Sequence, residues 1–119
     1  ASALELSQAY RERGREAWIL RLMGEIGRMR TPVQVEWTES QYRRAMGLAE
    51  DLAMRPLVAH CHFGLGQLWA QSGYSDKALE ELLRASDLYR SLNMTASLYE
   101  TEAALATISS GARLQGFAV

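Results

Sequence analysis

Apolar residues recur three and four positions apart in every segment of the chain, and no segment alternates apolar and polar residues as a strand would. The pattern therefore predicts an all-α fold of about six helices. The clearest apolar stripes are Val35, Thr38, Tyr42, Ala45, Ala49 and Leu52 in one segment, and Ala78, Leu82, Ala85, Tyr89 and Leu92 in another. Because the expected connections are short, sequential helices should pack antiparallel, as hairpins.

Capping and helix-breaking residues predict where these helices begin and end. Ser2 opens the first helix with a capping-box pattern, and Gly14 is expected to close it. Thr31-Pro32 predicts the start of the third helix, with a later start at Thr38 as the alternative. The expected helices are residues 2–13, residues 15–30, a helix that starts at 31, and then residues 56–73, 75–92 and 95–110.

Composition places the chain among ordinary globular domains. With 119 residues, 48% of them hydrophobic and 23% charged, it fits a single domain. The net charge of -1 predicts no general attraction to nucleic acid or to an anionic membrane. No apolar run approaches the ~20 residues of a membrane span. The single cysteine fits a reducing compartment, and the chain is interpreted as a piece of a longer cytoplasmic protein.

The stretch AHCHFGLGQLW, residues 59–69, is the one that suggests chemistry. On a helix the side chains of His60 and His62 point about 200° apart, whereas metal ligands on one helix share a face. Cys61 points a third way, and the chain has no other histidine or cysteine to complete a site. The stretch therefore predicts no metal site, with His60 facing a groove and the other two facing the core.

The two glycines in this stretch do not form a phosphate-binding loop. They lie inside a helix and are not followed by the Lys-Ser/Thr pair of a P-loop, so no cofactor is expected. A glycine within a helix costs ~1 kcal/mol relative to alanine. Close helix contact at Gly66, and at Gly24 upstream, would offset that cost. Gly64 is expected on the groove side, where replacement by alanine should be neutral or mildly stabilising.

Other catalytic patterns are absent from the sequence. There is no Gly-x-Ser-x-Gly elbow, and Cys61 has no evident activating partner. The acidic pairs Glu50-Asp51 and Glu80-Glu81 are interpreted as solvated helix faces. The sequence therefore gives no argument for an enzyme.

Spaced residues in the second half of the chain resemble the tetratricopeptide repeat family. The matching positions are His62-x-x-Leu65-Gly66-x-x-Trp69 on one helix, then Ala78-x-x-x-Leu82 and Ala85 on the next. The upstream positions Leu20-x-x-Met23-Gly24, Thr38-x-x-x-Tyr42 and Ala45 repeat the pattern with about two extra residues between the helices. The resemblance implies hairpins stacked as a short right-handed α-solenoid. The closer likeness is to the helical-repeat tail of bacterial signalling proteins that join a nucleotide-cyclase domain to an ATPase module.

The resemblance also implies how the chain divides. One helical-repeat domain covers residues 1–111. Residues 112–119 lack a periodic pattern, so a disordered tail is expected there independently of the resemblance. The domain consists of a half repeat at 1–14, repeats at 15–55 and 56–92, and a capping helix at 93–111.

In this family the first helices of successive repeats line a concave groove. Transferred to this sequence, that groove comprises Trp18, Arg21, Leu22, Glu25, Arg28, Met29, His60, Phe63, Gly64, Gln67, Ala70 and Gln71. The resemblance implies a non-catalytic module that binds a protein or peptide there, with the two arginines pairing a partner carboxylate. The alternatives are internal pairing of Arg21 with Glu25, a small-molecule sensor that regulates an attached domain, and a structural spacer.

Self-association is also expected, as a homodimer through the ends or the groove. Apolar side chains at both ends would lack a neighbouring repeat to cover them. These residues are Leu4, Leu6, Ala9 and Tyr10 near the start and Leu98, Leu105 and Ile108 on the last helix.

Overall fold

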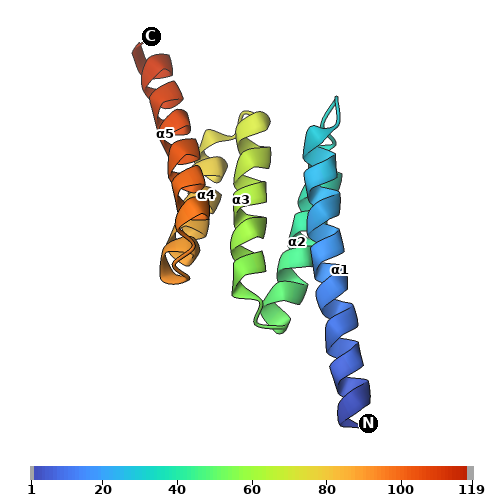
Figure 1. Ribbon diagram of the computed structural model, residues 1–119. Helices are drawn as coiled ribbons and strands as arrows, with labels where there is room; N and C mark the ends of the chain where they lie inside the picture. The colour runs from blue at the N-terminus through green and yellow to red at the C-terminus, as the bar shows by residue number, and fades with distance from the viewer. Residues whose placement is uncertain (1, 118–119) are drawn as a thin grey trace.

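The computed structural model describes residues 2–117, with side chains through residue 111, and shows five helices in series. They are α1 (Ala3–Met29), α2 (Val35–Asp51), α3 (Arg55–Gln71), α4 (Ser75–Ser91) and α5 (Thr95–Phe117). Each helix packs antiparallel against the next, so the all-α prediction is confirmed (Figure 1). The molecule is elongated, with extents of 65 × 33 × 18 Å. Figure 1 shows α1, α3 and α5 in front, with α2 and α4 behind them.

The two helices expected at residues 2–13 and 15–30 form a single helix, α1. Ser2 does cap it, since its Oγ accepts a 3.2 Å hydrogen bond from the Glu5 N–H. Helix α1 then continues through Gly14 to Met29, so the predicted end at Gly14 is wrong. A glycine ends a helix when it takes up a left-handed conformation, and among the described residues the only glycine with positive φ is Gly73. The expected six helices are therefore five.

The last helix is longer than the sequence suggested. Helix α5 continues past Gly111 to Phe117, so the prediction of a disordered tail is wrong for residues 112–117. Residues 118–119 lie outside the described part of the chain.

Helix α2 starts between the two positions that the sequence suggested. The helix begins at Val35, after a five-residue connection, rather than at Thr31-Pro32 or Thr38. Its N-cap residue Gln34 makes no side-chain capping bond. Packing fixes this end instead, because Thr38 is fully buried against Gly27 of α1.

The turns after α2, α3 and α4 are alike and recur every 20 residues. Each has three residues, and the middle one has positive φ: 56° at Ala53, 85° at Gly73 and 57° at Asn93. In each, the following residue donates its N–H to the carbonyl five positions back, at 2.8 to 2.9 Å. Glycine and asparagine are the residues that favour this conformation, whereas alanine is disfavoured in it, so only the turn at Ala53 is unexpected from the sequence.

Helices α2 and α4 bury side chains at equivalent positions, which are 40 residues apart in the sequence. The buried pairs are Thr38 and Ala78, Gln41 and Glu81, Tyr42 and Leu82, Ala45 and Ala85, Met46 and Ser86, and Ala49 and Tyr89. The two apolar stripes of the sequence are thus confirmed as the core faces of these helices.

Gly24 and Gly66 leave space for a large side chain of the following helix, Tyr42 in α2 and Leu82 in α4. A Cβ atom on Gly24 would lie 2.8 Å from Cζ of Tyr42, and one on Gly66 would lie 2.6 Å from Cγ of Leu82. The close contacts expected at both glycines are confirmed. The first hairpin connection, residues 30–34, is two residues longer than the second, residues 72–74. That difference accounts for the two extra residues found in the sequence.

Candidate partner-binding groove

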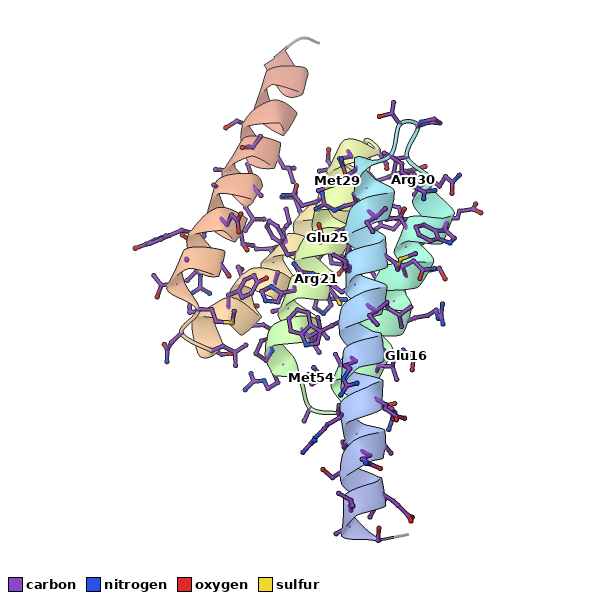
Figure 2. All side chains as sticks on the ribbon, turned by 45° about the vertical axis from the view of Figure 1, so that its right-hand side comes forward. Glu16, Arg21, Glu25, Met29, Arg30 and Met54 are labelled. Atoms are coloured by element: carbon purple, nitrogen blue, oxygen red, sulfur yellow. The ribbon has the colours of Figure 1, made fainter. Side chains whose placement is uncertain are left out.

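Helices α1 and α3 carry the residues that the sequence proposed as a groove, and α5 lies next to α3 on the same face (Figure 1). Figure 2 labels Arg21 and Glu25 on the side of α1 that faces α3. The structure brings nine of the twelve proposed residues to this face or its edges. The other three, Gly64, Leu22 and Met29, lie elsewhere and are described below.

An aromatic cluster joins α1, α3 and α4 at the centre of this face. The rings of Trp18 and His60 lie 6.1 Å apart, and those of His60 and Tyr89 lie 5.4 Å apart. His60 Nδ1 is 2.6 Å from the Tyr89 hydroxyl. Phe63 packs beside them, half-buried. Trp18 remains 43% exposed, so this cluster presents one large aromatic side chain to solvent on a fixed base.

Burial governs the ionisation of the cluster. It lowers the pKa of His60, and the positive charge of Arg21 lowers it further. Burial also raises the pKa of Tyr89 well above its ordinary value, so the phenol keeps its proton. The pair is therefore an uncharged hydrogen bond at neutral pH.

This arrangement predicts that stability falls as the pH drops. The His60 pKa lies below its ordinary 6.5 in the folded chain, so the unfolded chain takes up the proton first as the pH passes 6.5. Urea unfolding above and below this pH should show a lower free energy of unfolding at the lower pH. The His60→Gln substitution should remove the part of this decrease that comes from His60. An unchanged pH dependence in His60→Gln would contradict the assignment.

A second cluster links α1 to α2 through Glu25. This carboxylate accepts hydrogen bonds from Arg28 at 2.6 Å and from the Tyr42 hydroxyl at 2.8 Å. Arg28 also donates to the Tyr42 hydroxyl at 3.0 Å. Arg21 Nε lies 3.7 Å from Glu25 and has no hydrogen-bond partner among the described atoms. The internal pairing of Arg21 with Glu25 is thus present, and Arg28 makes two hydrogen bonds within the fold.

Arg21 is the arginine that remains oriented toward the aromatic cluster. Its guanidinium carbon lies 5.8 Å from the centre of the Trp18 ring. Arg28 is bonded to both Glu25 and Tyr42, whereas Arg21 has only the longer contact of 3.7 Å with Glu25. Arg21 is therefore the freer of the two arginines to meet a carboxylate.

The face continues into a cleft between α3 and α5. Its volume is about 320 Å³, and it is lined by Gln67, Ala70, Glu100, Ala103, Ala104, Thr107 and Ile108. Gln71, further along α3, donates to the backbone carbonyl of Arg28 at 3.4 Å. Sequence reasoning missed the contribution of α5. The recurrence of helix starts every 20 residues was the signal that could have placed it on this face.

Gly64 does not face the groove. It is buried, and a Cβ atom there would collide with the ring of Tyr42. The expectation that Gly64→Ala would be neutral is therefore wrong. Helix α2 crosses α3 at this position, and one sequence alone does not show which neighbour touches which side of a buried helix.

Leu22 and Met29 are exposed and fall in line with Ile19 and Ile26 rather than with the residues that face α3. They lie on the side of α1 away from α2.

The remaining residues of the stretch 59–69 are structural. Cys61 is fully buried, and burial raises the pKa of its thiol to about 12, so the thiol keeps its proton at neutral pH. His62 Nδ1 lies 2.7 Å from Glu81, on the opposite side of α3 from the groove. Among the described residues, no group of three or more His, Cys, Asp or Glu side chains is placed to hold a metal ion.

Glu81 corrects the interpretation of the acidic pairs as solvated. It is buried, and Arg43 of α2 lies 3.4 Å from it. Burial alone would raise the Glu81 pKa, but the hydrogen bond with His62 and nearby positive charges lower it below its ordinary value. This ionic contact ties α2, α3 and α4 together.

The comparisons add no family to this description. No family model, no curated protein and no solved structure matches the chain. None of the described helices combines the length and the apolar character needed to cross a membrane.

Proposed function

We propose that this chain is a tetratricopeptide-type module that binds another protein or peptide through the α1–α3–α5 groove and performs no catalysis. In this proposal its hairpins stack as a short right-handed solenoid within a larger bacterial signalling protein. The three similar turns and the 40-residue register of α2 and α4 support the repeat. The glycine contacts at Gly24 and Gly66 support its alignment with the sequence pattern.

The observation that carries the binding function is the exposed Trp18 on its fixed aromatic base. Tryptophan and arginine are enriched among the residues that dominate binding energy at protein interfaces. Trp18 is held against His60, with Arg21 beside it, so little side-chain freedom is lost on binding. The cleft between α3 and α5 extends this anchor along the face.

A small-molecule sensor is the second candidate, because the α3–α5 cleft of about 320 Å³ reaches the lower end of ligand-site volumes. Glu100, Ala103 and Thr107 in its lining are exposed. A cleft open along its length suits an extended or helical peptide better than an enclosed ligand.

Co-purification with matched variants tests the groove. The full chain should retain a partner that is lost from Trp18→Ser and from Ala103→Arg, since these change opposite sides of the groove. Leu83→Ser, at a 53% exposed leucine on α4, is the control and should retain the partner. Binding should then be reproduced with the purified partner. Retention of the partner by both groove variants would contradict the proposal. If the chain bound neither a partner protein nor a small molecule, a structural spacer would be the remaining function.

A further inference from the structure

Helix α1 carries an exposed apolar stripe on the side away from α2. Its members are Ile19, Leu22, Ile26 and Met29, which are 57%, 58%, 41% and 78% exposed, and we call them the outer stripe. Their spacing of three and four residues places them on one face. The α1 residues that bury against the fold, Ala17, Leu20, Gly24 and Gly27, share the opposite face. Figure 2 labels Met29 at the end of this helix.

The corresponding positions of α3 are covered by a helix. Gly24 and Gly66 are equivalent, because each receives the same register position of the following helix, Tyr42 or Leu82. Shifting by the same 42 residues pairs Ile19, Leu22 and Ile26 with Cys61, Gly64 and Leu68. All three of these α3 residues are buried, and Cys61 and Leu68 belong to the core cluster that includes Tyr42 of α2. Met29, the fourth member, pairs with Gln71, which is exposed at the end of α3. The first three members of the outer stripe thus occupy the positions at which α3 receives an antiparallel helix.

Two arginines continue the line of the outer stripe toward the start of α1. Arg11 and Arg15 are exposed, and neither forms an ion pair with any side chain in residues 2–111. Arg13, on the face of α1 that packs on α2, is an example of an arginine that pairs with a carboxylate of the neighbouring helix. It pairs at 3.3 Å with Asp51, at the C-terminal end of the antiparallel helix.

We propose that the outer stripe binds an amphipathic helix of a separate protein, antiparallel to α1, with apolar residues along its first turns and carboxylates in its last turn. The carboxylates meet Arg11 and Arg15, and the negative end of the helix dipole adds to that attraction. A second copy of α1 does not fit. In an antiparallel pair its C-terminal end would bring the exposed Arg30 toward the same two arginines.

The probe is a synthetic peptide of residues 35–51, the sequence of α2, labelled for fluorescence anisotropy. This sequence already covers the equivalent face of α3 and ends in Glu50-Asp51. A side-chain staple between positions 40 and 44, both exposed in α2, holds it helical and reduces the ordering cost. The full chain should bind it saturably.

Substitutions then locate the contact. Leu22→Ser combined with Ile26→Ser should weaken binding by about tenfold or more, since two apolar side chains lose their burial. Leu83→Ser on α4 should not change it, and neither should Ala103→Arg in the groove. The second control separates this proposal from the function proposed above, which Ala103→Arg tests. No peptide binding, or equal binding by the outer-stripe variant, would overturn the proposal.

A charge exchange tests the orientation. Arg11→Glu with Arg15→Glu should weaken binding by about threefold or more, while Arg44→Glu, an exposed arginine on α2, should have a smaller effect. A peptide carrying Glu50→Arg and Asp51→Arg should restore affinity to the charge-reversed chain. Failure of that rescue would overturn the antiparallel arrangement. A mass that doubles with concentration, and returns to that of one chain in the Leu22→Ser, Ile26→Ser variant, would identify a second copy as the occupant and overturn the proposal.

Discussion

Replacing Tyr42 with alanine should destabilise the fold by about 3–5 kcal/mol, the range for removing a large buried aromatic side chain. Tyr42 is completely buried, and its ring fills the space left by Gly24 of α1 and Gly64 of α3. Loss of the ring would leave a cavity at the junction of three helices. Its hydroxyl also bonds Glu25 and Arg28, so the same substitution loosens the ionic cluster of the groove.

Urea unfolding measures this effect, with two comparisons. Tyr42→Phe keeps the ring and removes only the hydroxyl, and should cost about 1–2 kcal/mol. Tyr10→Ala removes a tyrosine that is 60% exposed, and should change stability little. If Tyr42→Ala and Tyr10→Ala gave similar unfolding midpoints, the central packing role of Tyr42 would be refuted.

Adding side chains at the close-contact glycines of α3 should also be destabilising. Gly66→Leu should cost about 1–3 kcal/mol, because Leu82 already occupies the space in front of it. Gly64→Ala should be destabilising too, even though it adds one methyl group, since that group would overlap the buried ring of Tyr42.

Gly47 of α2 provides the matched control. It also lies inside a helix, but a Cβ atom there would meet no other atom within 4 Å. Gly47→Ala should therefore stabilise by about 0.4–1 kcal/mol, through helix propensity and a less flexible unfolded chain. Opposite signs for Gly47→Ala and Gly64→Ala in the same unfolding experiment are the expected result. Equal signs would show that the α2–α3 contact is not as tight as described.

Several features of this protein follow from the sequence alone. The stripes of α2 and α4 fixed which faces are buried, because a residue spacing near 3.6 admits only one apolar side on a helix. The opposite directions of His60 and His62 followed from the same geometry, and the structure gives them different partners, Tyr89 and Glu81. Close packing at Gly66 was predictable because a glycine within a helix is unfavourable unless a neighbour needs the space.

Contacts between helices decided the rest. Local residues at Gly14 and Thr31-Pro32 favoured ends that the structure does not use, because helix ends are weakly specified and packing overrides them. The placement of Gly64 beneath Tyr42, and of Glu81 between His62 and Arg43, depends on the crossing of helices distant in sequence. The groove likewise required the tertiary structure. Trp18, Arg21 and His60 were identifiable as candidates, but only the fold shows that Glu25 engages Arg28 while α5 supplies the far wall. Helical periodicity encodes which face of a helix is buried, whereas the identity of the neighbour that buries it is a property of the assembled helices.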